Sequence, residues 1–350
     1  MLPLAEAPQS VCILRLSALG DTCHVVPLVR TLQQAWPATR LTWIIGRAEA
    51  RLMSLIEGIE FITVDKRSTA GALRALRQAL RGRRFDVLLH LQLALRASLL
   101  AACVHARIKL GFDRPRAREL QWLFTNARIA PRSREHVLDS FLGLASALGI
   151  RTPVLRWDVP LPAAALEYAA RLIPDGAPTL LISPCSSHAQ RSWLPQRYAA
   201  IAAYAQQRHG LRVILCGSGS ATERRYGAQI SAACEAPLIN QIGQDTLPQM
   251  LALLARASAL LAPDSGPAHM AGMVGTPVLG LYAASNPQRS GPYLSRQWCI
   301  DQYPTAARVF RGCEPEELPW GHKIEQDGVM ELISVEQVTV GLDRLLEARA

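Results

Sequence analysis

The sequence predicts an α/β protein made of two domains, each with a parallel β-sheet. Short runs rich in Val, Ile and Leu alternate along the chain with longer Ala-, Leu- and Arg-rich segments of helical period. Repeated strand-then-helix units place consecutive strands parallel, joined by crossover helices. The pattern stops once, at a proline-rich stretch, and then restarts, and 350 residues exceed what a single core usually holds.

The first half supplies four strand and helix pairs and one further helix. That last helix is expected to end at Gly149, because glycine commonly follows helix C-termini. In order, the strand-like runs and the helices expected after them are "VCILRL" with 22–36, "LTWIIG" with 47–57, "EFITVD" with 70–82 and "FDVLLHLQ" with 94–104, followed by the helix 136–150.

The second half repeats the pattern after "RTPVLRWDVPLP" and the turn "PDGAP". Because such stretches mark linkers, we place one domain at 1–160 and the other at 161–350. Residues 300–328 are expected to be loop. An amphipathic helix closes the chain, and it could pack back on the first domain. The expected pairs are "TLLISP" with 195–208, "RVILCG" with 221–234, "LINQIG" with 246–257 and "ALLAPD" with 266–274, before "PVLGLY".

The net charge of +10, from 38 Lys and Arg against 28 Asp and Glu, predicts anionic partners. Nearly all the cations are arginine, which binds phosphate and carboxylate through paired hydrogen bonds. Charge alone does not separate nucleic acid, an anionic membrane face, nucleotides and acidic glycans. Eight scattered cysteines predict reduced thiols in the cytosol. No signal peptide is visible, and polar residues interrupt the most apolar stretch, 87–106, too often for a membrane span.

The segment "LLAPDSGPAHMAGM" is the sharpest candidate for a binding site. It places Asp264 and Ser265 at the carboxyl end of a strand, where parallel sheets bind ligands. Gly266 allows close approach of a phosphate to the helix start, and His269 lies one turn further on as a hydrogen-bond donor. An ordinary helix cap explains the same residues about equally well.

Two further loops are expected at the same sheet edge. In "PCSSHAQRSWLP", Arg191 could neutralise a phosphate, with Trp193 as an anchor, although a solvated surface arginine is the simpler interpretation. In "GSGSATER", Glu223 could accept hydrogen bonds from ribose hydroxyls. A tight glycine turn explains that second loop at least as well.

Asp21 follows the first strand of the amino-terminal half, in "LSALGDTCH". At this place an acid commonly caps a helix and interacts favourably with its dipole. A carboxylate facing a cleft could equally take a proton from an incoming hydroxyl. The residues by themselves leave both interpretations open.

Several motifs together resemble glycosyltransferase family 9, the ADP-heptose:lipopolysaccharide heptosyltransferases. "LRLSALGDTCHVVPLVRTLQQAWP" is similar to the start of that family, and "PDSGPAHMAGMVGTPVLGLYAASNP" to its donor-binding segment. Arg191-Ser-Trp occupies the place of a family Lys-x-Trp motif, and "RARELQWLFTN" resembles an acceptor-side segment. The resemblance implies a GT-B enzyme, with two Rossmann-like domains whose parallel sheets face each other across a cleft.

The resemblance also implies an activity: inverting transfer of a heptose from ADP-heptose to an inner-core sugar of lipopolysaccharide. Residues 1–160 would then bind the acceptor and 161–350 the nucleotide-sugar donor. Asp21 would be the general base, and Glu223 the ribose-binding acid. The diphosphate would be held by Ser265, Gly266 and His269, with Asp264 shaping the loop or touching the sugar, and Arg191 standing in for the family lysine.

An acidic lipopolysaccharide acceptor would require cations on the first domain. The candidates there are Lys66, Arg67, Arg96, Arg114, Arg116 and Arg118. A basic surface explains each one singly, whereas the set favours an anionic acceptor and peripheral contact with the inner face of the inner membrane. No metal ligands are predicted and no cofactor is required; a divalent ion is not indicated, since no D-x-D motif lies between apolar strands.

Three alternatives remain from the sequence. Within the family, the enzyme could use another nucleotide sugar or extend another glycan. A Rossmann oxidoreductase is disfavoured because "SALGD" follows the first strand where a G-x-G-x-x-G motif is expected. A basic nucleic-acid-binding protein is disfavoured because no recognised motif or aromatic platform is present.

Overall fold

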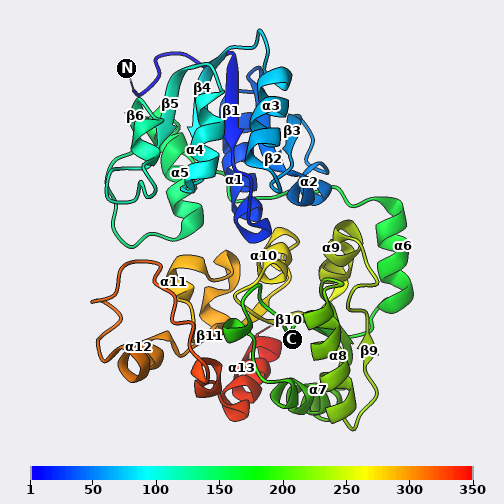
Figure 1. The fold of residues 1–350 in the computed structure, drawn as a ribbon. Helices are drawn as coiled ribbons and strands as arrows, with labels where there is room; N and C mark the ends of the chain where they lie inside the picture. The colour runs from blue at the N-terminus through cyan, green and yellow to red at the C-terminus, as the bar shows by residue number, and fades with distance from the viewer. Residues whose placement is uncertain (1, 349–350) are drawn as a thin grey trace. The chain divides into compact units, whose positions relative to one another are not determined.

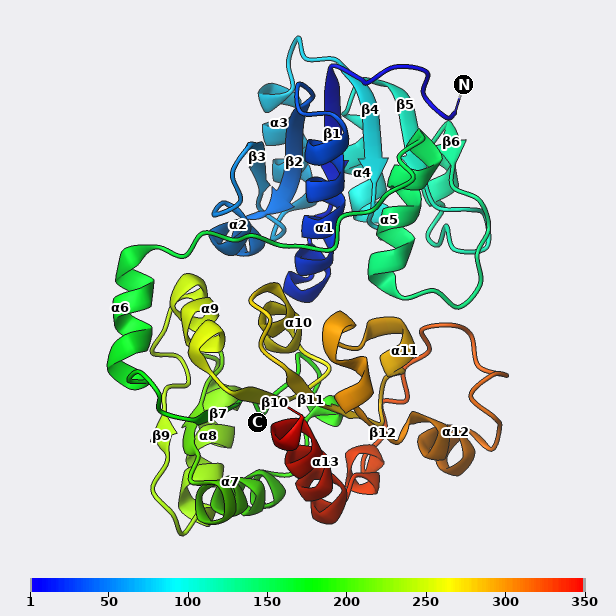
Figure 2. The ribbon, with the colours of Figure 1, turned by 180° about the vertical axis from the view of Figure 1, so that it is seen from behind.

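The computed structural model describes residues 2–348, and it divides into two compact units, Met1–Pro160 and Leu161–Ala350. The boundary lies inside the proline-rich stretch that follows the first run of strands and helices. Each unit contains its own six-stranded parallel sheet with helices on both faces (Figures 1 and 2).

The first unit has strand order β3-β2-β1-β4-β5-β6. Its central strand β1 is buried along its whole length, which is typical of parallel sheets covered on both faces. Figure 1 shows α3 and α4 on one face, and Figure 2 shows α1 and α5 on the other. The elements are β1 (Ser10–Leu14), α1 (Leu19–Ala35), β2 (Arg40–Gly46), α2 (Arg47–Met53), β3 (Ile59–Val64), α3 (Thr69–Ala79), β4 (Phe85–His90), α4 (Leu95–Ala102), β5 (Ala106–Gly111), η1 (Gln121–Leu123), β6 (Ala127–Arg128) and α5 (Val137–Leu148).

The second unit has the order β12-β11-β10-β7-β8-β9, which is the same topology as the first. Helices α6 and α10 pack on α9, while α8 and α13 pack on α7. The elements are α6 (Ala163–Leu172), β7 (Thr179–Ile182), η2 (Ala189–Arg191), α7 (Pro195–His209), β8 (Arg212–Leu215), α8 (Ala221–Ala233), β9 (Ile239–Asn240), α9 (Leu247–Arg256), β10 (Ala259–Pro263), α10 (Gly266–Met273), β11 (Val278–Tyr282), α11 (Pro287–Ser290), η3 (Tyr293–Trp298), β12 (Ile300–Asp301), α12 (Tyr303–Arg311), η4 (Val329–Leu332) and α13 (Val335–Glu347).

The strand order reverses between β1 and β4 in the first sheet and between β7 and β10 in the second. Open parallel sheets bind ligands at the carboxyl ends of such strands, because the loops diverge there and leave room. Asp21 follows β1, the loop with Arg191 follows β7, and Asp264 follows β10. The topology therefore puts the main predicted site residues at the ligand edge of their own sheets.

The prediction of loop over 300–328 was wrong for residues 300–311, whereas residues 312–328 form a loop as predicted. Residues 300–301 form the edge strand β12, and Tyr303–Arg311 form α12. Pro304 obscured that helix, although proline is well tolerated in a first helical turn. The closing helix α13 packs on α7, β11 and β12 of the second unit.

Three smaller differences concern the first unit, and one of them is strand β5 (Ala106–Gly111), which was not predicted. Helix α1 begins at Leu19, before the expected residue 22, so Asp21 lies inside its first turn. The two-residue edge strand β6 was not predicted, because two residues carry no periodic signal. No helix within residues 2–348 combines the length and apolar character needed to cross a membrane.

Candidate active site

Asp21 lies in the first turn of α1, after the loop that follows β1. Its Oδ2 atom accepts a hydrogen bond from the amide of Ala18 at 3.3 Å and forms an ion pair with Arg15. The carboxylate thus does satisfy an amide at the helix start, as the capping interpretation predicts. Both contacts use Oδ2, so among residues 2–348 the half-buried carboxylate keeps Oδ1 without a hydrogen-bond donor.

Arg15 holds this carboxylate in place, and the sequence analysis did not single it out. Its side chain is 13% exposed, and Nη1 donates to the carbonyl of Leu91 at 2.6 Å, from the end of β4. A planar guanidinium fixed in this way offers a rigid donor to Asp21. A signal was present: Arg15 continues the apolar run "VCIL", and a cation that follows a buried strand needs a partner.

Two of the predicted acceptor-side cations lie together at the same edge of the first sheet. Lys66 follows β3 and pairs with Glu49 at 2.6 Å, and its side chain lies against the backbone of Gly46. Arg96, in α4, donates to the carbonyl of Lys66 at 2.8 Å. The Arg96 guanidinium therefore lies against the backbone of the loop after β3 that carries Lys66.

The other predicted acceptor-side arginines are more exposed or structural. Arg67 pairs with Asp65 at 2.7 Å, and its side chain is 85% exposed. Arg114 stacks on the ring of Trp122, 3.7 Å from its centroid, and Arg118 is exposed. Arg116 bonds Asp113 and Glu135 and so fixes the loop after β5.

In the second unit, the start of α10 departs from an ordinary capped helix. Ser265 occupies the N-cap position, but its side chain makes no capping hydrogen bond, and its buried Oγ has no partner among residues 2–348. Gly266 begins the helix, and the first turn contains no acidic side chain. Amides at such a helix start attract anions through their N–H groups and the helix dipole.

Asp264, immediately before that helix, is the centre of a buried polar cluster. Its carboxylate contacts Lys323 Nζ at 2.6 Å and His269 Nε2 at 3.8 Å, and Ser290 Oγ at 3.4 Å. Burial by itself would raise the pKa of Asp264, but the Lys323 ammonium and the His269 ring outweigh burial and hold it well below its usual value. Asp264 is therefore an anion that organises its neighbours.

Arg191, in the loop after β7, belongs to the same cluster. Its side chain is 16% exposed and forms an ion pair with Glu325, with Nε donating to Oε1 at 2.6 Å. Trp193 is fully buried, which confirms its predicted role as an anchor. Lys323 and Glu325 come from residues 300–328, which the sequence analysis expected to be loop and where no local pattern marks a site.

Glu223 is occupied within its own loop. One carboxylate oxygen accepts from the amide of Ser218 at 2.6 Å, and the other accepts from the Ser218 hydroxyl. Its own amide is capped by Ser220 at 3.2 Å. These contacts give Glu223 the role of bracing a tight turn, as the alternative interpretation describes, and its contact with a ribose stays a prediction.

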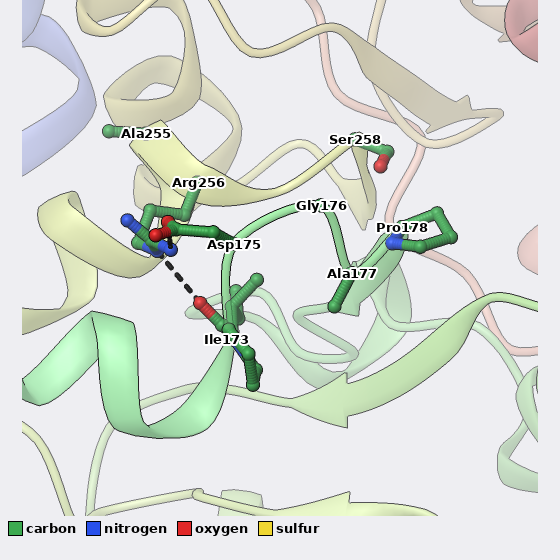
Figure 3. Close-up of a pocket in the computed structure, with 9 residues that line it drawn as sticks. Ile173, Asp175, Gly176, Ala177, Pro178, Ala255, Arg256 and Ser258 are labelled. Atoms are coloured by element: carbon green, nitrogen blue, oxygen red, sulfur yellow. Dashed lines mark hydrogen bonds and ion pairs between the residues drawn. The ribbon is translucent and has the colours of Figure 1, made fainter.

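A pocket of about 470 Å³ lies elsewhere, around the loop between α6 and β7 (Figure 3). It is lined by residues 173–178 and by Ala255, Arg256 and Ser258, at the amino ends of β7 and β10. Arg256 donates to the carbonyl of Ile173 at 2.8 Å and pairs with Asp175 at 2.5 Å. This pocket is therefore at the sheet edge opposite to the Asp264 cluster. The positive group in its lining, Arg256, already pairs with Asp175.

Two Rossmann-like domains of identical topology, one with a carboxylate held at its ligand edge and one with a cationic cluster beside an uncapped helix start, form the architecture found in GT-B glycosyltransferases. Residues 73–317 match the family model described as Glycosyltransferase family 9 (heptosyltransferase). The chain belongs to this family. The matched range includes Arg191 and Asp264, whereas Asp21, Lys323 and Glu325 lie outside it.

Individual relatives agree with this membership. The chain is 39% identical to the lipopolysaccharide core heptosyltransferase OpsX of Haemophilus influenzae over 97% of this chain and 98% of that protein. It also resembles the crystal structure of a family 9 glycosyl transferase from Veillonella parvula, with a TM-score of 0.79, 22% identity and 97% of each chain covered. A third similarity is to the Escherichia coli ADP-heptose lps heptosyltransferase II, with a TM-score of 0.73, 20% identity and coverage of 97% and 99%.

Proposed function

We propose that this glycosyltransferase moves a heptose from ADP-heptose to an inner-core sugar of lipopolysaccharide, with inversion at the anomeric carbon. The observation that carries the proposal is the uncapped start of α10 beside Arg191 and Asp264. That arrangement suits a diphosphate, because main-chain amides and a guanidinium can share its charge. The kinship with an enzyme named lipopolysaccharide core heptosyltransferase supports the choice of sugar and acceptor.

In the proposed reaction Asp21 is the general base. The acceptor hydroxyl gives its proton to Oδ1 while its oxygen attacks the anomeric carbon of the heptose. The bond between that carbon and the β-phosphate oxygen breaks, and ADP leaves with the electron pair. Arg15 keeps Oδ2 occupied, so Oδ1 is the oxygen available to the substrate.

The second domain stabilises the departing diphosphate. The amide of Gly266 and the amides after Pro267, which itself has no N–H, donate to phosphate oxygens, Ser265 adds its hydroxyl, and Arg191 adds positive charge. Asp264 shapes the loop, and Glu223 accepts from the ribose. These protein groups supply the charge stabilisation in the proposal, so we expect turnover to persist in the presence of EDTA; loss of activity restored by Mg²⁺ would contradict this part.

The acceptor is proposed to bind the first domain through Lys66 and Arg96, with Arg67, Arg114 and Arg118 on the surrounding surface. An acceptor carried by a membrane lipid implies peripheral contact with the cytoplasmic face of the inner membrane. Flotation with vesicles of anionic lipid should recover the protein at low ionic strength and lose it as salt rises, because screening weakens such contacts. Equal flotation with neutral vesicles would show that charge does not cause the binding to the membrane.

The test of the function is product analysis. Purified protein is incubated with ADP-heptose and truncated core acceptors, and a product heavier by one heptose is expected in the mass spectrum. Thermal stabilisation by ADP, UDP and GDP then separates the main alternative, a family member that uses another nucleotide sugar. Preference for UDP would overturn the choice of ADP-heptose.

A further inference from the structure

Residues 319–328 form the last part of the loop between α12 and η4, and they are tied firmly to the second sheet. Ile324 is fully buried in the core, and its amide donates to the carbonyl of Ala284, after β11, at 2.9 Å. Gly321 has φ +87° and lies against the Arg289 guanidinium, so a side chain there would be strained and would collide. The segment therefore holds Lys323 and Glu325, on either side of Ile324, at a fixed place.

That place is the ligand edge of the second sheet. Lys323 contacts Asp264 after β10, and Glu325 contacts Arg191 after β7. Arg289, in α11 after β11, is close enough to Lys323 to lower the pKa of its ammonium. Three cations and two carboxylates thus meet at the ends of three adjacent strands, beside the uncapped start of α10.

Lys323 is unusual in this chain and costly where it lies. It is the only lysine after residue 109, in a sequence whose other Lys and Arg residues are arginine except for Lys66 and Lys109. Its side chain is 24% exposed, and burial lowers its pKa despite the opposing effect of Asp264; Arg191 and Arg289 lower it further. An ammonium has three donors, and the contact with Asp264 uses one, so Lys323 can also bind an anion.

We propose that Lys323 is a direct ligand of the donor's diphosphate, supplied by the C-terminal segment, and that Glu325 occupies Arg191 until the diphosphate replaces it. The inference rests on the proposed donor binding but adds residues outside the family match. Asp264 holds the ammonium at the edge of the site, while Glu325 competes with phosphate for the Arg191 guanidinium. The two residues therefore act on diphosphate affinity in opposite directions.

The test measures binding of inorganic pyrophosphate, ADP and adenosine by calorimetry to the full-length wild type and to variants. Lys323→Gln keeps a hydrogen bond to Asp264 but loses the charge, and about a tenfold loss of pyrophosphate and ADP affinity is expected, with adenosine unchanged. Lys323→Arg should recover part of the loss. Glu325→Gln should raise pyrophosphate affinity several-fold.

The matched control is Arg256→Met, in the same domain at the opposite sheet edge. Its side chain is 26% exposed and also pairs with one carboxylate, so this variant removes the same charge with no change in pyrophosphate binding expected. Thermal melting checks that each variant is folded. If Lys323→Gln disturbs folding, the Glu325→Gln variant still tests whether Glu325 competes with the diphosphate for Arg191. This variant leaves the buried Lys323–Asp264 pair intact.

The proposal is overturned if folded Lys323→Gln binds pyrophosphate like wild type, if Arg256→Met loses as much affinity, or if Glu325→Gln weakens binding. Failure of the proposed function would look different. A wild type that transfers no heptose or prefers UDP still binds pyrophosphate through Lys323 if the inference holds. If the wild type transfers heptose and Lys323→Gln binds pyrophosphate with the same affinity as the wild type, the proposed function stands and only the inference about Lys323 is overturned.

Discussion

Asp21 combines a structural and a proposed chemical role in one carboxylate. Oδ2 is tied to the Ala18 amide and to Arg15, while Oδ1 is left for a substrate. The sequence presented these roles as competing explanations. The structure places them on different oxygens, so an assay of turnover and an assay of stability report on them separately.

Asp21→Asn should retain donor binding and lose turnover by several orders of magnitude, because an amide cannot accept the hydroxyl proton. The loss of the Arg15 ion pair should lower the melting temperature by only a few degrees. Asp139→Asn is the control, since Asp139 is also an acid in the first turn of a helix of this unit. Wild-type turnover in Asp21→Asn would reduce Asp21 to a helix-capping group.

His90, at the end of β4, should make the first unit less stable in acid. Burial lowers its pKa from 6.5 to about 3, with Arg15 and Lys109 adding to the effect. Between pH 6.5 and about pH 3, His90 is therefore protonated in the unfolded chain and neutral in the folded chain. His90 therefore costs no stability above pH 6.5. As the pH falls from 6.5 towards 3, the free energy of unfolding decreases by about 1.4 kcal/mol per pH unit because of this residue.

Denaturant unfolding at pH 7 and pH 5 measures this slope. The free energy of unfolding of wild type should fall more between the two pH values than that of His90→Gln, which keeps a partner for Ser98 Oγ but does not titrate. Parallel losses in the two proteins would show that His90 is protonated without penalty in the fold.

At the scale of elements, the loops after β8 and β9 depend on close backbone contact. Gly243 has φ +73°, and an added Cβ would lie 2.6 Å from the Cα of Gly219. The carboxyl ends of these strands can approach each other this closely only because both residues lack side chains. The loop that Glu223 braces is thereby fixed against its neighbour.

Gly243→Ala should destabilise the second unit by about 1–3 kcal/mol, from backbone strain together with the collision. Gly176→Ala is a matched control, because Gly176 has the same φ of +73° but nothing within 4 Å of an added Cβ. The difference between the two melting temperatures isolates the contact between the loops. Equal shifts would mean that the loops separate without cost.

At the scale of the whole molecule, the proposed donor site is made entirely of residues from the second unit. Arg191, Asp264, Lys323 and Glu325 all lie between Leu161 and Ala350. Each unit also has its own sheet and its own buried core. Donor binding is therefore expected to need one unit, whereas transfer needs the base from the other.

A fragment of residues 161–350 should bind ADP with an affinity close to that of the full chain and show no transfer. Calorimetry with ADP and a heptose transfer assay measure the two properties, and circular dichroism establishes that the fragment is folded. A folded fragment without ADP affinity would show that residues of the first unit complete the donor site.

The sequence by itself determined the α/β class, the parallel sheets, most helices and the positions of Asp21, Arg191 and Asp264 after strands. These features follow from local periodicity and from the rule that open parallel sheets bind ligands at the carboxyl ends of their strands. Helix α12 was missed because a proline near its start resembled a break. The edge strands β6 and β12 are too short to have a period.

Only the tertiary structure decided which side chains share a site. Arg15 meets Asp21 because the loop after β1 and the carbonyl of Leu91 after β4 are neighbours in the sheet. Lys323 lies 59 residues from Asp264 along the chain, and Glu325 lies 134 from Arg191. The contacts of Lys323 and Glu325 carry no signal in local sequence, because they are set by the crossovers that bring distant loops to one sheet edge.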